Sequence, residues 1–568
     1  MTPTIKVTAA VCGLKGRRSP AQGAAAKLRN PGINCPQASG GLKDRQERVS
    51  AGPSGRMRSW GIETQGCAAP SVRTASLHPG LGSAGLSDRR TLTPFKTTDL
   101  GRSSVCRIIS FFALSIAFSP VCSAAEPAEP TETVVRMTVQ PMAAPKPALK
   151  YQLLPELWEM NPGNPVQGYL MCFMNFNFFH LQAAVEQREK WLEAPLKDLP
   201  VEKILDNIRY GATENADFAA RLDTPDWQVL LRLKRDGANT VLPDVNEIHD
   251  LASVLKLRFR AQAAGRRFDE AISGAKTMLA ISRHLGEHPT AVAALVGLVF
   301  VDMALDPLEE MIQQPGCPNL YWALSNLPIP LIDLHKAISS DRDIFRLNFA
   351  LLDETVPMSE AQVEKAIEEL TVSRKWDREA AKKNKEFQDR LGALVKNEGG
   401  VDAARKRLIE SGLASEAVKQ FRLTQVILLD EKNKYEMLRD DVLKLTNLPY
   451  WQIESTLVES KKKEEDDAST LFAWMATRFD EPTNLVRREQ RIALLRCVEA
   501  LRLYAADHDG KLPAKLDDVP VPVPVDPVTG KSFSYQLDGA TAILHGTPPR
   551  GKEKDAQYNR RYEITIRK

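Results

Sequence analysis

The segment His284-Leu285-Gly286-Glu287-His288 has the residue types and the spacing of a zinc site. Two histidines four residues apart lie on one face of a helix, where both imidazoles can bind the same Zn²⁺ ion. A glutamate between them can act as general base toward a metal-bound water. The pattern therefore predicts one alternative function, a zinc-dependent hydrolase with Glu287 as the catalytic residue and His284 and His288 as the metal ligands.

The residues around this motif favour a simpler interpretation. Gly286 lies inside the motif and Pro289 follows it directly, and both residue types weaken a helix at that point. A third, acidic ligand would have to come from downstream, where the candidates are Glu354, Glu360 and Glu364. Because a catalytic pair needs a rigid helix interior, we expect no metal and no catalytic residue here. The two histidines are expected to be partly exposed at the turn between two helices.

Two aromatic segments resemble each other, NLYWALSNLP at 319–328 and NLPYWQ at 447–452. Tyrosine and tryptophan combine a large apolar area with a polar tip, which suits a ligand groove or a partner interface. The candidate binding residues are therefore Tyr321, Trp322, Tyr450 and Trp451. The simpler alternative is that these side chains anchor loops and helix starts to the core.

Charge divides the chain of 568 residues into two unlike parts, although the formal net charge is only +4. Residues 1–104 carry 16 Lys and Arg against 5 Asp and Glu, whereas the remaining residues carry 60 basic and 67 acidic side chains. A broad nucleic-acid surface needs clustered positive charge. The acidic body of the protein therefore argues against a nucleic-acid partner.

The first part of the chain has the composition of an unfolded segment followed by a targeting signal. Residues 1–104 are rich in Gly, Ser, Pro and Arg without helical or strand periodicity, and are expected to be a disordered or mis-assigned extension. Residues 105–124 have the design of a signal peptide, with Arg107 before the apolar run 108–118 and small residues at 123–125. This predicts export to the periplasm, the cell envelope or the extracellular space. The apolar run is too short for a mature transmembrane helix, and we expect none.

Three further segments follow: a Pro/Ala-rich linker at 125–149, a helical body at 150–484 and a C-terminal α+β module at 485–568. In the body, apolar residues recur at steps of three and four from Ile248 to Phe259, which predicts a helix. Pro289 is expected to open another helix, apolar nearly all round and therefore the most buried.

The segment AAGRRFDEAI at 263–272 resembles the helix-turn-helix of tetratricopeptide repeats. No second clean copy follows at the 34-residue period of that family. The resemblance therefore implies one repeat-like helical hairpin rather than a regular solenoid.

The end of the chain predicts one helix on a three-stranded antiparallel sheet. The helix covers 487–510, where Gly510 can adopt the left-handed conformation that closes it. Alternating segments at 532–537 and 540–544 flank Asp538-Gly539, a strong hairpin signal, and 561–568 alternates as a third strand. The predicted fold class is thus mainly α, with a helical-hairpin body and a small α+β module.

This module resembles the C-terminal part of type II secretion pseudopilins through ALRLYAADHDGKLPAKLDD at 500–518 and PVDPVTGKSFSY at 524–535. The chain lacks a prepilin peptidase motif, so the resemblance does not carry pilus assembly over to it. The mature chain also resembles a group of exported proteins of planctomycete bacteria, from which no activity carries over. The phrases that carry this second resemblance are PALKYQLLPEL at 147–157, QQPGCPNLYWALSNLP at 313–328 and LRDDVLKLTNLPYWQ at 438–452.

These features together predict an exported protein that works by binding, or that is a structural component of the cell envelope, rather than an enzyme. Its expected partner is an envelope protein or polymer. The sequence does not define the oligomeric state. The zinc-dependent hydrolase remains the alternative, with zinc as its cofactor.

Overall fold

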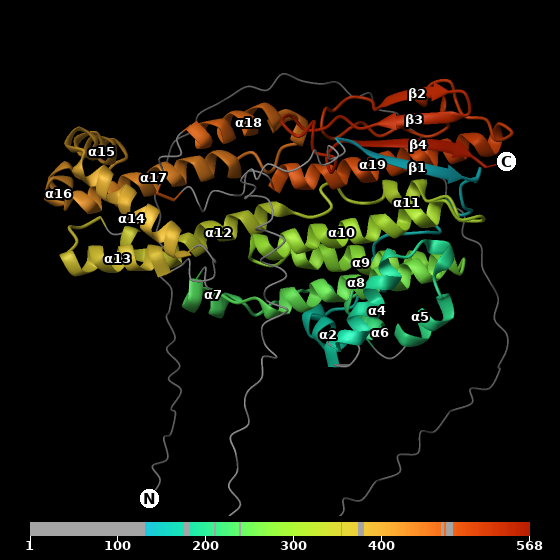
Figure 1. The fold of residues 1–568 in the computed structure, drawn as a ribbon, viewed down its shortest axis with the longest axis horizontal. Coiled ribbons are helices and arrows are strands. Elements are labelled where there is room, and N and C mark those ends of the chain that lie inside the picture. The colour runs from blue at the N-terminus through green and yellow to red at the C-terminus, as the bar shows by residue number, and fades with distance from the viewer. Residues whose placement is uncertain are drawn as a thin grey trace, which may run out of the picture. The chain divides into compact units, whose positions relative to one another are not determined.

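The computed structural model describes residues 131–567 with gaps at 175–180, 209–211, 238–239, 354, 373–379, 467–470 and 473–480. The predicted N-terminal extension, the signal peptide and Glu354 lie outside the described residues. The described part of the chain is mainly helical, with a small mixed sheet of four strands (Figure 1).

The elements follow in chain order. The strands are β1 (Thr133–Val139), β2 (Ser534–Asp538), β3 (Thr541–His545) and β4 (Arg560–Ile566). The helices up to residue 325 are α2 (Pro165–Met171), α4 (Gln182–Glu193), α5 (Val201–Ile208), α6 (Ala212–Ala219), α7 (Leu230–Asp236), α8 (Pro243–Ala264), α9 (Phe268–Gly286), α10 (Ala291–Ile312) and α11 (Tyr321–Ser325). The later helices are α12 (Leu334–Asn348), α13 (Glu360–Val372), α14 (Ala380–Lys396), α15 (Glu398–Glu410), α16 (Ser415–Gln420), α17 (Leu423–Leu443), α18 (Tyr450–Asp466) and α19 (Glu481–Asp507). Short 3-10 turns lie at Leu157–Glu159, Cys172–Met174, Leu196–Asp198, Ala350–Asp353 and Leu516–Asp518.

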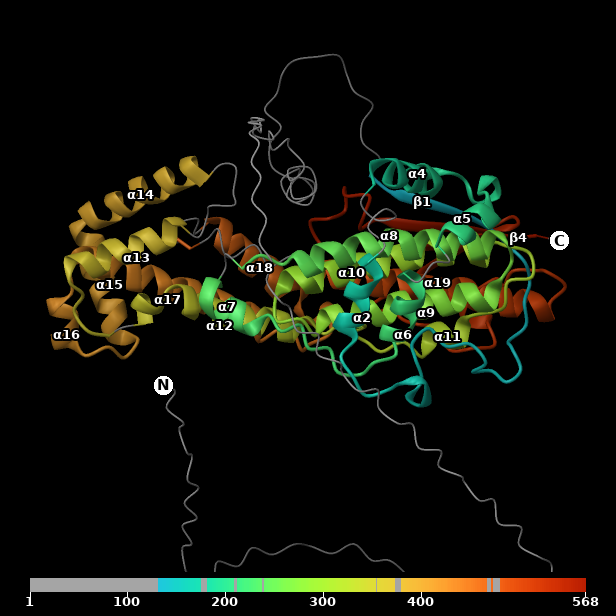
Figure 2. The same ribbon diagram turned by 90° about the horizontal axis from the view of Figure 1, so that it is seen from below.

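Helices α8 and α9 form the predicted helical hairpin. Gly265 caps α8, and Arg266 turns the chain with a φ of +57° before Phe268 begins α9. Helix α10 packs against both, so that the three lie side by side (Figure 2). The three helices supply most of the buried apolar residues between 245 and 312, which makes them the centre of the main core.

Helix α10 begins two residues later than predicted. Thr290 is its N-cap, and its hydroxyl accepts a hydrogen bond from the backbone N–H of Ala293 at 3.4 Å, so Pro289 precedes the helix instead of opening it. A threonine hydroxyl can satisfy a free helix N–H that a proline cannot. Among the described residues, α10 is the one helix long and apolar enough to cross a membrane, and 61% of its most apolar window is buried inside the protein.

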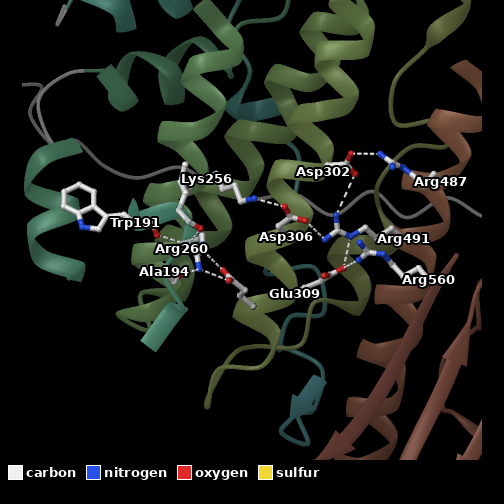
Figure 3. Close-up of polar contacts among 12 residues, drawn as sticks. Trp191, Ala194, Lys256, Arg260, Asp302, Asp306, Glu309, Arg487, Arg491 and Arg560 are labelled. Carbon is white, nitrogen blue, oxygen red and sulfur yellow. Dashed lines mark hydrogen bonds and ion pairs between the residues drawn. The ribbon is translucent and has the colours of Figure 1, made fainter. Parts of the chain in front are cut away.

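The C-terminal half of α10 carries three carboxylates on one face, at residues 302, 306 and 309, and these bind basic side chains of neighbouring elements (Figure 3). Arg491 of α19 donates to Asp306 and to Glu309 at 2.7 Å each. Lys256 of α8 reaches the other oxygen of Asp306 at 2.6 Å. Because Asp306 accepts from both sides, this ladder of ion pairs fixes α10 between α8 and α19.

Helix α19 packs on α10 and on β4, so it lies between the helical hairpin and the sheet (Figure 1). Its buried positions Leu494, Val498 and Leu501 belong to the same hydrophobic cluster as residues of α8, α9 and α10 and of the sheet. The predicted division at 484/485 therefore separates segments that share one core. A second cluster gathers apolar residues of 349–472 together with Val486 and Val528.

The sheet corrects two predictions. Strands β2, β3 and β4 are antiparallel as predicted, and Gly539 (φ +57°) lies in the turn between β2 and β3. A fourth strand, β1, pairs in parallel with β4, giving the order β1-β4-β3-β2. It comes from the predicted linker at 125–149, which is therefore not a linker over Thr133–Val139. Met137 and Val139 are buried in the main core, and this burial holds the strand in place.

Candidate functional site

The two Asn-Leu-Pro segments, far apart in the sequence, line the same pocket. Leu327 and Pro328 follow α11, and Asn447, Leu448 and Pro449 lead into α18. The pocket has a volume of about 740 Å³, and its lining is mostly apolar. Pockets of this size and character are typical of small-molecule sites in proteins.

One face of helix α19 forms a continuous side of the pocket. The contributing residues recur at steps of three and four, and they are Pro482, Leu485, Val486, Glu489, Ile492, Ala493 and Arg496. This stripe follows the helix from Pro482 to Arg496, and its 14 residue-to-residue steps of 1.5 Å give a length of about 21 Å. We call it the α19 stripe. The opposite side comes from residues 324–334, 446–453 and 524–527, so the pocket is an elongated apolar groove along the helix.

Two ionisable residues of the α19 stripe have no charged partner among the described residues. Neither Glu489 nor Arg496 makes a hydrogen bond or an ion pair there, and the Nε atom of Arg496 is fully buried. The Arg496 guanidinium lies 5.8 Å from the centre of the Tyr321 ring, a cation–π distance. The two residues are seven positions apart, which separates them by about 10 Å along the helix.

The apolar surroundings change the acidity of Glu489. Burial raises the pKa of this carboxyl to about 7, because removing a carboxylate from water disfavours its charged form. The side chain can therefore be neutral or charged near neutral pH. The third charged residue of the lining, Asp333, is exposed and accepts a hydrogen bond from the backbone N–H of His335 at the start of α12.

The structure brings two of the four candidate binding residues into the lining. Tyr450 is buried, and Trp451 is 48% exposed with its indole against Gly530. Tyr321 lies behind the lining, where its hydroxyl donates to the carbonyl of Pro522 and its ring faces the Arg496 guanidinium. Trp322 packs edge-on against Tyr321, with ring centres 4.9 Å apart, and is not part of the lining.

The H-x-x-E-H segment lies at a helix end, as Gly286 and Pro289 indicate, because α9 ends at Gly286. The expectation of partly exposed histidines is wrong. His284 is 8% exposed, and its Nδ1 atom is 2.6 Å from the Tyr169 hydroxyl. His288 is fully buried, with its Nδ1 atom 2.8 Å from the Thr290 hydroxyl. Burial lowers the pKa of both imidazoles to about 4, so both are neutral at pH 7.

The three residues of this motif have separate surroundings. Glu287 is half exposed and binds Lys336 of α12 at 2.5 Å, while His288 packs against the Trp227 ring. Within the described ranges, no group of three or more His, Cys, Asp and Glu side chains is arranged to hold a metal ion. The side chains of this motif therefore have structural contacts in the folded protein, and the geometry gives no support to zinc binding here.

Glu489 and Arg496 were not predicted as site residues. A signal for them exists in the sequence, since both occupy one otherwise apolar face of a single helix. The pocket itself depends on four segments that are distant in sequence, which no local pattern reveals. No protein-family model, no curated protein and no solved structure matches this chain.

Proposed function

We propose that this chain is an exported binding protein and that the groove along the α19 stripe holds its ligand. The observation that carries the proposal is the pair Glu489 and Arg496, which make no hydrogen bond or ion pair among the described residues and lie in an apolar groove of about 740 Å³. Both side chains are half-buried, and an ionisable group that is taken out of water without a partner costs free energy. A ligand that contacts these groups would offset that cost. Export is supported by the signal-like segment at 105–124.

The same groove suits a role in the cell envelope, where an exported binding protein meets lipids, polymers and other proteins. A purely structural role does not explain why two ionisable residues line an apolar groove without an ion pair among the described residues, which is why binding is the better proposal. The alternative of a zinc-dependent hydrolase is less well supported, because Glu287 binds Lys336 and the Nδ1 atoms of both histidines already contact hydroxyl groups.

The test is saturable binding of a neutral apolar fluorophore, N-phenyl-1-naphthylamine, to the purified protein. Val525 lines the groove and is 53% exposed, so Val525→Trp fills part of the groove without disturbing the core. Val356, which is 55% exposed and outside the lining, provides the matched control Val356→Trp. We expect Val525→Trp to weaken fluorophore binding at least tenfold, and Val356→Trp to leave it unchanged. Absence of saturable binding, or equal binding by the two variants, would contradict the proposal.

A further inference from the structure

We propose that the ligand of this groove is a linear amphiphile with an anionic head, held with its head at Arg496 and its chain along the α19 stripe. The inference rests on the proposed function and specifies its ligand class. It follows from three features of the groove: its length, the position of its one permanent cation and the position of Glu489.

The length of the α19 stripe favours a chain-like ligand. The stripe extends over about 21 Å, and apart from its two ionisable residues its side chains are apolar. Apolar surface buried against such a stripe contributes about 0.8 kcal/mol for each CH₂ group. An extended alkyl chain buries the largest number of such groups in a groove that follows a straight helix.

The position of Arg496 favours an anionic head. Arg496 lies at one end of the stripe, with its guanidinium positioned over the Tyr321 ring and without an acidic partner among the described residues. A planar guanidinium binds a carboxylate through two parallel hydrogen bonds, and such charge-assisted bonds are stronger than neutral ones. An ammonium head would instead be repelled by the charge of Arg496 at this end of the groove.

The position of Glu489 couples binding to a proton. Glu489 lies midway along the stripe, so an alkyl chain that reaches from Arg496 toward Pro482 passes over its carboxyl group. Burial under an alkyl chain is costly for a carboxylate and much less so for a neutral carboxylic acid. The bound state therefore takes up a proton at Glu489. The other charged groups of the lining are Arg496 and the exposed Asp333.

The pKa of Glu489 in the ligand-free protein determines how strongly binding depends on pH. With a free pKa of about 7, Glu489 is about nine-tenths protonated at pH 6 and about one-tenth protonated at pH 8. Binding that requires the neutral acid should therefore weaken about tenfold between these two pH values. A ligand carboxylate with an ordinary pKa stays ionised over the same range.

The experiment compares dodecanoate, dodecanol and dodecylammonium as competitors of the neutral fluorophore on the purified protein. We expect dodecanoate to bind about tenfold to a hundredfold more tightly than dodecanol, in line with a charge-assisted hydrogen bond. Arg496→Met should abolish this preference, and Arg496→Lys should retain part of it. Circular dichroism and thermal unfolding of both variants, compared with the wild type, show whether the fold is intact.

The pH series uses dodecanoate with the wild-type protein and with Glu489→Gln. Wild-type affinity should fall about tenfold from pH 6 to pH 8, and the variant should show no such fall. A fall that persists in Glu489→Gln would locate the proton on the ligand and overturn the role of Glu489. Equal affinity for dodecanol and dodecanoate, or tighter binding of dodecylammonium, would overturn the anionic head while fluorophore binding still supports the groove. If neither fluorophore nor amphiphile binds, the proposed function itself fails.

Discussion

The two buried histidines at the end of α9 predict a loss of stability in mild acid. His284 faces the charged groups of Arg283, Glu287 and Asp223, and His288 faces those of Asp244 and Arg232, yet burial dominates at both imidazoles and lowers their pKa to about 4. In the unfolded chain a histidine has a pKa of about 6.5. The unfolded state therefore binds protons more readily than the folded state between these values.

The direction of the effect follows from this difference. A depressed folded-state pKa contributes stability that is fully present above pH 6.5 and is lost as the pH falls toward 4. For one histidine with pKa values of about 4 and 6.5, the loss relative to pH 8 is about 2 kcal/mol at pH 5 and about 3 kcal/mol at pH 4. The two together would lose roughly 4 kcal/mol at pH 5, a large share of the 5–15 kcal/mol that stabilises a typical domain.

The assay is urea unfolding of the wild-type protein and of His288→Asn at pH 7.5 and pH 5, followed by circular dichroism. His288→Asn lowers stability at both pH values, but its further loss between them should be about 2 kcal/mol smaller than in the wild type. The matched control is His249→Asn, which removes a partly exposed histidine from α8 instead of a buried one. The reasoning is refuted if the wild type and His288→Asn lose the same free energy of unfolding between pH 7.5 and pH 5.

Three further predictions concern the packing around the groove and the core. Gly530→Ala should lower the melting temperature more than Gly539→Ala. Both glycines have a positive φ, but only at Gly530 would a Cβ come within 2.9 Å of a neighbouring side chain, the Trp451 indole. Thermal unfolding measures the difference, and equal shifts in melting temperature would argue against this close approach. Arg491→Met should cost about 2 kcal/mol in urea unfolding, since it removes the buried arginine that binds Asp306 and Glu309, although Asp306 keeps Lys256 and Glu309 keeps Arg560. A cost below about 1 kcal/mol would show that the ion-pair ladder does not hold the helices together. Met137→Ala in β1 should lower the free energy of unfolding by about 2–5 kcal/mol. The control Met437→Ala, at a position 71% exposed, should change it by no more than about 0.5 kcal/mol. Equal losses in urea unfolding would mean that β1 is not part of the core.

Local patterns in the sequence predicted the local structure well. The turn at Gly265, the tight hairpin at Asp538-Gly539 and the left-handed Gly510 (φ +74°) all depend on neighbouring residues, and the structure confirms each of them. Strand β1 was missed because prolines flank it on both sides and its partner lies 427 positions further along the chain, from Thr133 to Arg560. Pairing at such a distance leaves little trace in a local pattern.

The candidate site shows the same limit. Tyr450 and Trp451 were predicted as binding residues from their residue types, and both line the groove. Glu489 and Arg496 were not predicted, because their lack of an ion pair among the described residues depends on the folded structure. Whether His284 and His288 are exposed also depends on tertiary packing, here on Tyr169, Trp227 and Thr290.

The parallel pairing of β1 with β4 has a consequence for folding order. In a polypeptide made from its N-terminus, the residues of β1 are synthesised before those of β4, which follow more than four hundred residues later. Such a distant contact carries a high loop-closure entropy and forms late. Strand β1, with its apolar residues Met137 and Val139, therefore stays without its partner strand until nearly all of the described chain has been synthesised. Completion of the sheet thus requires the residues of β4, and a chain truncated before residue 560 would leave this surface open to chaperones and proteases.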